Sequence, residues 1–192
     1  MQKPVWLLYT NEDLIHKSKE IIKLINIKEN MNVLDLGCGN GIMLSPYLEF
    51  TKNIYGVDKL YMNIQQCRVN LGAPRENFKV DYIEAFINKT DKKFDVIIIH
   101  GVIGYLNLHD QNVLLKKCMN KLNDNGYIIL GAVNFYDDKY IFQTYPMKHT
   151  FIDEFCNKNN LTYKIYNDSD LELTPKYNGV TIILNRHNQD RY

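Results

Sequence analysis

Many apolar residues of this chain lie in short clusters, separated by longer stretches in which apolar residues recur at helical spacing. The clusters predict strands at residues 33–36, 53–57, 78–83, 94–99 and 127–133, with a turn at residues 124–126 before the last of them. Residues 94–99 are almost wholly apolar, which is typical of a strand buried on both faces of a parallel sheet. Predicted helices follow at residues 42–50, 61–71, 110–122 and 150–159. Strands that alternate with helices predict an α/β fold with a doubly wound, mostly parallel sheet.

The two ends of the chain depart from this alternation. Thr10 has the pattern of a helix cap and precedes an N-terminal amphipathic stretch, and Thr150 has the same pattern before the last predicted helix. Two further strands are predicted at residues 161–166 and 180–184, and only a long polar connection, residues 167–178, lies between them. Because no helix separates these two strands, they should pair as an antiparallel hairpin.

The composition is that of an ordinary globular protein with one core. The chain has 192 residues, of which 45% are hydrophobic and 23% charged, and its formal net charge is +1. Its length favours a single domain, and the balanced charge argues against nucleic acid or an anionic membrane as a partner. No apolar run approaches the ~20 residues of a membrane span, and no secretory signal is evident, so a cytoplasmic protein is expected. The four cysteines lie far apart without C-x-x-C spacing, which indicates neither a metal site nor a disulfide framework.

The most informative motif follows the first predicted strand, where Gly37, Gly39 and Gly41 fall at every second position. Glycines at the end of a buried strand allow a sharp turn with φ > 0 and let a ligand approach the backbone closely. A helix expected to begin at about Gly41 would add unpaired N–H groups and a positive dipole end. A dinucleotide fingerprint would need its third glycine one place later, where this chain has Ile42.

The run Asp-Leu-Gly-Cys-Gly-Asn-Gly at residues 35–41 resembles the glycine-rich motif of class I S-adenosylmethionine-dependent methyltransferases. The resemblance extends over residues 32–186 and implies a Rossmann-like, seven-stranded sheet whose last strand is antiparallel. It divides the chain into an N-terminal helical lid (residues 1–30), the methyltransferase domain (31–186) and a polar tail (187–192). It also implies S-adenosylmethionine as the cofactor.

The same resemblance places the amino acid end of the cofactor at the glycine loop. The loop residues expected to contact it are Gly37, Cys38, Gly39, Asn40 and Gly41, with Asp35 in the strand before them. A buried aspartate needs a partner because an unpaired one costs several kcal/mol, so a role for Asp35 in orienting the loop or meeting the methionine ammonium is favoured.

Acids at the ends of the second and third strands complete the expected cofactor site. Asp58, followed by Lys59, matches the family's ribose-binding acid, and a carboxylate can accept both ribose hydroxyls. Asp81 matches the acid that receives the adenine amino group, with Tyr82 and Ile83 as walls of the ring. The alternatives are a strand-ending aspartate at position 58 and a solvated loop acid at position 81, where Glu84 competes for the role.

Reactive residues are expected just beyond the fourth strand. His100 follows its apolar run and is a candidate general base and cofactor contact, since histidine accepts protons near neutral pH. Tyr105 is a second candidate, as a hydrogen-bonding or stacking group for the substrate. The competing interpretation makes His100 a packing or cofactor-contact residue without a proton role and Tyr105 a core aromatic.

Two further segments are candidates for binding the acceptor. His149, with Tyr145 and Lys148, follows the aromatic-rich residues 134–140, where the family recognises its acceptors; a surface loop is the alternative. Trp6 and Tyr9 can belong either to a lid over the cofactor or to the packing of the first helix.

These residues together predict an enzyme that transfers a methyl group to oxygen or nitrogen of a small-molecule acceptor, such as a metabolite, a sugar or a biosynthetic intermediate. The chain lacks the Asn/Asp-Pro-Pro-Tyr/Phe motif of the family's enzymes for planar amino groups and the Pro-Cys pair of cytosine-C5 enzymes. A nucleic-acid base is therefore not the expected acceptor. The remaining alternatives are a protein or RNA methyltransferase, a non-catalytic cofactor-binding partner subunit and, more weakly, a nicotinamide enzyme.

Overall fold

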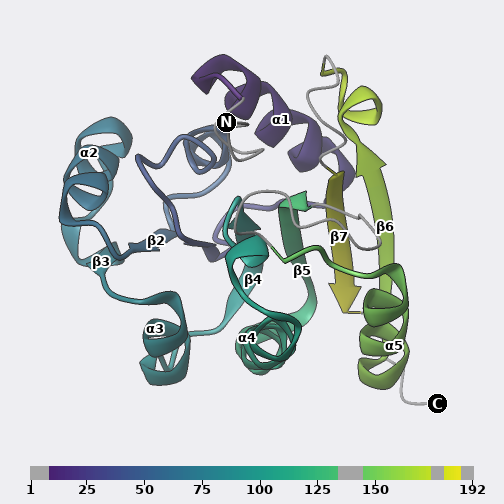
Figure 1. Cartoon of the computed structure of the whole chain (residues 1–192). Coiled ribbons are helices and arrows are strands. Elements are labelled where there is room, and N and C mark those ends of the chain that lie inside the picture. Colours follow the sequence, from purple (N-terminus) through teal and green to yellow (C-terminus); the bar gives the residue numbers. More distant parts are fainter. Residues whose placement is uncertain (1–8, 134–144, 174–179, 187–192) are drawn as a thin grey trace, which may run out of the picture.

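A computed structural model describes residues 9–133, 145–173 and 180–186. One sheet of seven strands, in the order β3-β2-β1-β4-β5-β7-β6, forms the centre of this part of the chain (Figure 1). The strands are β1 (Val33–Leu36), β2 (Ile54–Asp58), β3 (Phe78–Val80), β4 (Phe94–His100), β5 (Leu122–Val133), β6 (Leu161–Asn167) and β7 (Val180–Arg186). Strands β1 to β5 pair in parallel, and β7 pairs antiparallel with both β5 and β6. The predicted sheet and its terminal hairpin are confirmed.

Five α-helices and four short 3-10 helices surround the sheet in the described residues. The α-helices are α1 (Asn11–Leu24), α2 (Tyr61–Leu71), α3 (Ile83–Lys89), α4 (Leu108–Lys121) and α5 (His149–Asn159). The 3-10 helices are η2 (Ser45–Glu49), η3 (Arg75–Asn77), η4 (Ile103–Tyr105) and η5 (Asp168–Leu171). Helices α1 and α2 cover one face of the sheet, and α3, α4 and α5 cover the other (Figure 1).

The apolar residues 96–99 of β4 follow from this three-layer arrangement. Ile97 and Ile99 belong to the core beneath α3, α4 and α5. Val96 and Ile98 belong to the core beneath α1 and α2. Because successive side chains of a strand point to opposite faces, the part of a strand that is covered on both faces needs apolar residues at consecutive positions.

The prediction of a helix that begins at about Gly41 and spans residues 42–50 is wrong. Residues 41–44 form turns, and the 3-10 helix η2 follows them with Pro46 at its start. Proline has no backbone N–H, so an α-helix through this segment would lose one of its hydrogen bonds. The glycine loop therefore does not lead directly into an α-helix, and no long helix dipole points at the site from this segment.

Other boundaries also differ from the predictions. Strand β3 ends at Val80, and the sequence expected to extend it enters α3, whose Ile83, Phe86 and Ile87 have helical spacing. Strand β5 begins at Leu122, and the predicted turn at residues 124–126 is an irregularity within it, where the β4–β5 register shifts. Propensity alone could not separate these cases, because tertiary pairing decides them.

The helix ends were predicted with mixed success. Thr10 caps α1 as expected, accepting a hydrogen bond from the Asp13 backbone N–H, and the Asp13 side chain accepts one from the Thr10 backbone N–H in return. Thr150, in contrast, lies inside α5, and Lys148 is the N-cap residue without a side-chain cap bond. The polar connection after β6 contains η5, and its residues 174–179 lie outside the described part of the chain, as does the polar tail.

Candidate functional site

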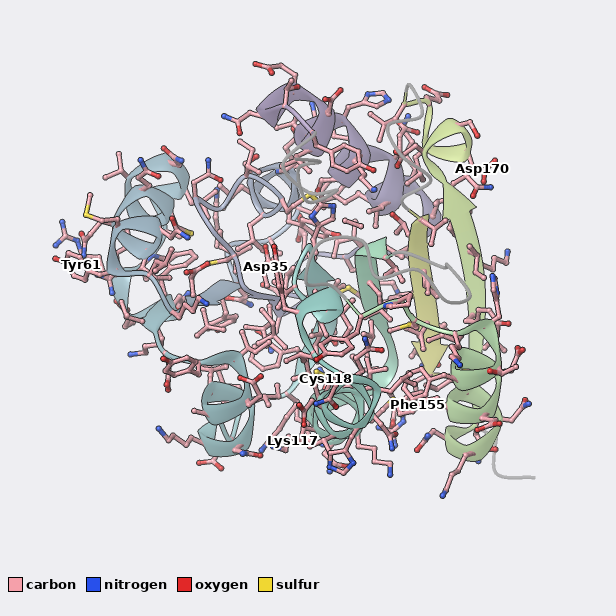
Figure 2. All side chains as sticks on the ribbon, in the orientation of Figure 1. Asp35, Tyr61, Lys117, Cys118, Phe155 and Asp170 are labelled. Atoms are coloured by element: carbon pink, nitrogen blue, oxygen red, sulfur yellow. The ribbon has the colours of Figure 1, made fainter. Side chains whose placement is uncertain are left out.

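A cavity of ≈ 730 Å³ lies at the carboxyl ends of β1, β2 and β4. Its lining comes from the glycine loop, the segment after β2, the start of α3 and the segment after β4. Asp35, near the end of β1, lies close to the middle of the molecule (Figure 2). A crevice at the carboxyl ends of parallel strands is the general ligand site of open α/β sheets.

The three glycines of the loop have different reasons for lacking a side chain. All three have positive φ, of 89° at Gly37, 51° at Gly39 and 82° at Gly41. A Cβ at Gly37 would overlap the side chain of Val102, and a Cβ at Gly41 would come within 2.8 Å of the side chain of Leu71 on α2. Only Gly39 has open space beside it. Gly39 lines the cavity together with Gly37, whereas Gly41 packs against α2 and is not among the lining residues.

Asp58 ties the glycine loop to the end of β2. Its Oδ2 accepts a hydrogen bond from the Gly39 backbone N–H at 3.1 Å, and its Oδ1 accepts one from Leu60 at 2.8 Å. Asp58 and the adjacent Lys59 both line the cavity. Each carboxylate oxygen has a second lone pair, so Asp58 can hold the loop and still accept hydrogen bonds from a ligand.

Asp35 is buried, and its Oδ1 has no hydrogen-bond partner among the described residues. Burial, with a smaller contribution from the nearby Asp58 carboxylate, raises the pKa of Asp35 to about 8. An unpaired buried carboxyl group is unfavourable. Its place in the cavity wall therefore suits a ligand that brings a cation or an N–H donor to it.

Asp81, Tyr82 and Ile83 form the cavity wall at the start of α3. The backbone N–H of Asp81 donates to the Asp58 carbonyl oxygen at 3.2 Å, and its Oδ1 accepts from the Tyr82 backbone at 2.9 Å. The side chain of Tyr82 is largely exposed, and that of Ile83 is buried. The competing acid, Glu84, also lines the cavity.

His100 ends β4 and lines the same cavity. Its imidazole lies over Gly131, the residue paired with it on β5, where a Cβ would overlap the ring. Its Nε2 is buried and has no hydrogen-bond partner among the described residues. Burial, assisted by the positive charge of Lys17, lowers the pKa of His100 to about 3. His100 is therefore a neutral hydrogen-bonding group at physiological pH.

The remaining candidates are divided between the cavity and the surface. Tyr105, in η4, lines the cavity and is partly exposed. His149 is the first residue of α5. His149, Tyr145 and Lys148 are all exposed, and none of them lines the cavity. Trp6 and the aromatic-rich residues 134–140 lie outside the described part of the chain.

Two buried charged residues, one on α1 and one after β6, form an ion pair that was not predicted from the sequence. Lys17, on α1, and Asp168, just after β6, are both buried and form an ion pair at 3.2 Å. Tyr9, expected either in a lid or in packing, donates a hydrogen bond from its hydroxyl to Asp168 at 2.6 Å. The signal for Lys17 was its place four residues before Ile21 on the buried stripe of α1. Asp168 carried no comparable signal, because it lies in a polar connection.

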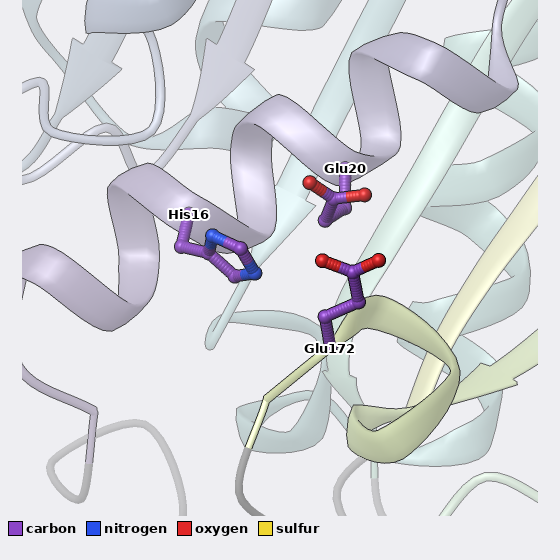
Figure 3. Close-up of side chains that lie close together, drawn as sticks. All are labelled: His16, Glu20 and Glu172. Atoms are coloured by element: carbon purple, nitrogen blue, oxygen red, sulfur yellow. The ribbon is translucent and has the colours of Figure 1, made fainter.

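Three potential metal ligands, His16, Glu20 and Glu172, form a separate group between α1 and the end of η5 (Figure 3). Their ligand atoms lie within 4.8 Å of one another, and none of the three lines the cavity. Glu20 already accepts a hydrogen bond from Lys23 Nζ at 2.6 Å, and Glu172 is exposed. The four cysteines are buried and free. No helix in the described ranges is long and apolar enough to cross a membrane.

Comparison with known proteins identifies the family. A family model described as a methyltransferase domain matches residues 9–164, which is most of the chain. The chain therefore belongs to this methyltransferase-domain family. Its strand order with an antiparallel β7 is that of the class I S-adenosylmethionine-dependent methyltransferases, as expected from the glycine motif.

The chain spans only about half to three fifths of the length of the curated relatives that it matches. A ubiquinone biosynthesis O-methyltransferase of Pelagibacter ubique (strain HTCC1062) is 28% identical over 141 residues, which cover 72% of this chain and 57% of the relative. A protein of the same name from Bradyrhizobium diazoefficiens is 26% identical over 133 residues, 68% of this chain and 51% of the relative. A carboxy-S-adenosyl-L-methionine synthase of Vibrio vulnificus (strain YJ016) is 26% identical over 166 residues, 82% of this chain and 62% of the relative.

Solved structures support the fold. Magnesium protoporphyrin IX methyltransferase from Synechocystis PCC 6803, with bound S-adenosylmethionine, has a TM-score of 0.68 at 15% identity, covering 92% of this chain and 79% of that one. The plantazolicin methyltransferase BpumL, in complex with S-adenosylhomocysteine, has a TM-score of 0.67 at 18% identity, covering 97% of this chain and 86% of that one.

Proposed function

We propose that this chain is an S-adenosylmethionine-dependent methyltransferase that methylates oxygen or nitrogen of a small-molecule acceptor. The observation that carries the proposal is the pairing of a glycine loop with two acids at one cavity. The loop is open at Gly39 and is tied to Asp58, while Asp35 presents an unpaired buried oxygen beside it. A ligand with an ammonium group, a ribose and an apolar ring matches this set of contacts.

Each part of the cavity has a proposed partner on the cofactor. Asp35 would meet the methionine ammonium, which supplies the cation that the buried carboxyl group lacks. Asp58 would accept the ribose hydroxyls through its remaining lone pairs. Asp81 would receive the adenine amino group, with Tyr82 and Ile83 against the ring. Lys59, Cys38 and Asn40 line the same wall and would complete the contacts. Gly41 is proposed to support the loop through its packing on α2 rather than to touch the cofactor.

The chemistry required of the protein is mainly alignment. When bound, the cofactor supplies a methyl group on a sulfonium that is already activated for displacement. The residues beyond β4 would hold the acceptor atom in line with that methyl group, and such positioning can contribute about 7–11 kcal/mol to lowering the barrier. The cavity wall would also exclude water during transfer.

His100 is proposed to orient the acceptor through the unpaired Nε2. A general base is most effective when its pKa lies near the working pH, and a pKa of about 3 makes His100 a weak base. We therefore favour His100 as a hydrogen-bond acceptor for a hydroxyl or amine over His100 as the holder of its proton. Tyr105 is proposed as a partly exposed aromatic neighbour of the acceptor, and His149 is left with no place in this cavity.

The class of acceptor is supported by charge and by similarity. The apolar residues Leu14, from α1, and Val102 and Leu106, from the segment after β4, line the same cavity as His100. Apart from Lys59, the charged side chains in the described lining are acids. That lining favours an uncharged small molecule over a phosphate-rich polymer. The small-molecule names of the curated methyltransferase relatives agree with this choice, although the chain spans only part of their length.

The test begins with cofactor binding. In titration calorimetry, S-adenosylhomocysteine should bind at micromolar affinity and NAD should not bind. Labelled S-adenosylmethionine is then offered with a panel of uncharged phenols, alcohols and amines, with a short peptide and an RNA oligomer as additional acceptors. Methyl transfer to a small molecule supports the proposal, and exclusive transfer to peptide or RNA replaces it with the macromolecular alternative. NAD binding without S-adenosylhomocysteine binding would exclude the proposed cofactor.

A further inference from the structure

Tyr9, Lys17 and Asp168 form a buried polar group, here called the Tyr9–Lys17–Asp168 assembly. Asp168 Oδ2 accepts a hydrogen bond from the Tyr9 hydroxyl at 2.6 Å, and Asp168 Oδ1 accepts one from Lys17 Nζ at 3.2 Å. Lys17 Nζ also lies 4.7 Å from the centre of the Tyr9 ring. Each of the three side chains therefore contacts the other two.

Stability alone does not explain this assembly. Removing two charges from water is costly, and apolar residues of similar volume often replace a buried ion pair without loss of stability. Lys17 and Asp168 are nevertheless buried among apolar neighbours such as Ile21 and Leu171. A directional polar group in such a place specifies geometry more than it adds stability, and the geometry it specifies is that of Tyr9.

The fold brings the assembly to the same edge of the sheet as the cavity. Strand β6 is antiparallel to β7, and β7 is antiparallel to β5, so β6 runs in the same direction as β5 and β4. Asp168 follows the last residue of β6, and His100 is the last residue of β4. Both therefore lie at the carboxyl edge, with α1 above them.

Tyr9 is the link between the assembly and His100. The two rings meet edge to face, with their centres 6.1 Å apart and their planes at 71°. On another side the imidazole lies against Gly131, where even a Cβ would overlap it. The His100 ring is thus held between the backbone of β5 and the Tyr9 ring.

We propose that Tyr9, Lys17 and Asp168 are positioning residues, which fix the imidazole of His100 so that its Nε2 can receive the acceptor. Asp168 and Lys17 hold the Tyr9 ring, and the Tyr9 ring confines His100 against Gly131. The inference rests on the proposed function, because it assigns the assembly to the acceptor side of the same cavity. It adds three residues, one just before α1, one in α1 and one at the start of η5, that do not line the described cavity themselves.

The experiment measures the His100–Tyr9 geometry directly by NMR. The two rings should give a nuclear Overhauser effect (NOE) in the full-length protein, with the His100 signals assigned by their loss in His100→Gln. The main variant replaces the ion pair as a unit, Lys17→Met with Asp168→Leu, so that no lone charge stays buried and no acceptor is left for the Tyr9 hydroxyl. Tyr9 and His100 are unchanged in it. We expect the NOE between them to weaken at least threefold, with His100 signals broadened by ring motion.

Two internal references separate positioning from unfolding. The ring pair Tyr55 and Phe94, with centres 5.6 Å apart, should keep its NOE in every variant. The matched control is Tyr163→Phe, which removes another Tyr–Asp hydrogen bond, to Asp153, at an exposed place on β6. It should leave the His100–Tyr9 NOE unchanged. If the paired variant loses the Tyr55–Phe94 NOE as well, Tyr9→Phe replaces it, because this variant removes only the hydroxyl that Asp168 holds.

The outcomes distinguish this inference from the proposed function. An unchanged His100–Tyr9 NOE in a folded paired variant, or in Tyr9→Phe when that variant replaces it, overturns the positioning role. S-adenosylhomocysteine should bind the parent and the paired variant within about twofold of each other, and turnover on an identified acceptor should fall at least tenfold in the variant. A parent that binds no S-adenosylhomocysteine would refute the proposed function instead, whatever the NOE shows. A weakened NOE with full turnover would show that the assembly positions His100 without catalytic effect, and this also overturns the inference.

Discussion

Asp35 and Asp58 are neighbouring acids whose surroundings differ sharply. Asp58 accepts hydrogen bonds from two backbone N–H groups, of Gly39 and Leu60. Asp35 has an oxygen without a partner in the described residues and a pKa raised to about 8. Asp58 is therefore tied to the glycine loop, whereas Asp35 is available for a ligand.

The raised pKa of Asp35 predicts proton release when the cofactor binds. In the free protein at pH 7, a carboxyl group with a pKa of about 8 is mostly protonated. An ammonium group brought beside it favours the charged form and lowers the pKa. Binding of S-adenosylhomocysteine at pH 7 should therefore release up to one proton. Calorimetry in buffers of different ionisation enthalpy measures this number, which should fall to near zero in Asp35→Asn.

The raised pKa of Asp35 also affects how the stability of the free protein depends on pH. The folded-state pKa of Asp35 lies above its ordinary value of 3.8, so the folded state binds this proton more tightly than the unfolded state does. Stability from this group is fully present below about pH 4 and decreases as the pH rises toward 8. Asp35→Asn should remove this decrease, which urea unfolding at pH 5 and pH 8 can measure. Equal pH dependence in both proteins would contradict the shift.

Asp58→Ala should weaken binding of S-adenosylhomocysteine by about 2–4 kcal/mol, because the ribose hydroxyls lose a charged acceptor. The Gly39 N–H loses its partner as well, so the loop also becomes less fixed. Calorimetry measures the change in affinity. Asp124→Ala removes an exposed acid on β5 and should bind like the parent. Parent-like affinity in Asp58→Ala would reduce Asp58 to a structural residue.

Gly131→Ala tests the placement of His100 from the side of β5. The new Cβ would overlap the imidazole, so His100 has to turn away. Turnover should fall roughly 10²-fold or more, as expected for the loss of a positioned group at the reacting atom. Cofactor affinity, measured by calorimetry, should stay within about twofold, since Gly131 does not line the cavity. Normal turnover in Gly131→Ala would show that the position of His100 is unimportant.

At the scale of single elements, the sequence predicted strands better than it predicted the segments that join them. The apolar run of β4 and the hairpin of β6 and β7 were correct because burial on two faces leaves a strong pattern. The prediction of an α-helix after the glycine loop was wrong because Pro46 interrupts its hydrogen bonds. Helix α3 was missed, and its first residue, Ile83, was assigned to the third strand. In both cases a local pattern fits two structures, and tertiary packing selects one.

Helix α1 depends on its buried ion pair in a way that stability measurements can detect. Asp168→Ala should lower the free energy of unfolding by about 3–5 kcal/mol, because Lys17 is left buried without its partner. The paired change Lys17→Met with Asp168→Leu should cost far less, since it leaves no lone charge. Chemical denaturation measures both values.

The control for this prediction is an exposed pair on the same helix. Lys19 on α1 and Glu49 on η2 lie 3.9 Å apart with both side chains exposed. Glu49→Ala should change the stability by less than about 1 kcal/mol. Similar losses in Glu49→Ala and Asp168→Ala would contradict the special cost assigned to the buried pair.

Across the whole molecule, the residues proposed to bind the cofactor were easier to locate from the sequence than the residues around His100. The glycine loop and the acids at positions 35, 58 and 81 lie within one local motif each, at strand ends that the pattern already located. The position of His100 could be predicted from the end of β4, but the Tyr9–Lys17–Asp168 assembly beside it could not. Lys17 and Asp168 are separated by 151 positions and meet only because β6 returns to the same edge of the sheet. A pattern within one segment cannot reveal such a contact.

That separation also bears on how the molecule is made. A ribosome synthesises α1 before the other described elements, yet Asp168, which binds Tyr9 and Lys17, follows Lys17 by 151 positions. Strands β1 to β4 are therefore synthesised before Asp168, the residue that pairs with Lys17. Contacts between distant residues form slowly, because closing a long loop costs more entropy than closing a short one. The assembly would then close last, so that His100 acquires its neighbour only when the far edge of the sheet is complete.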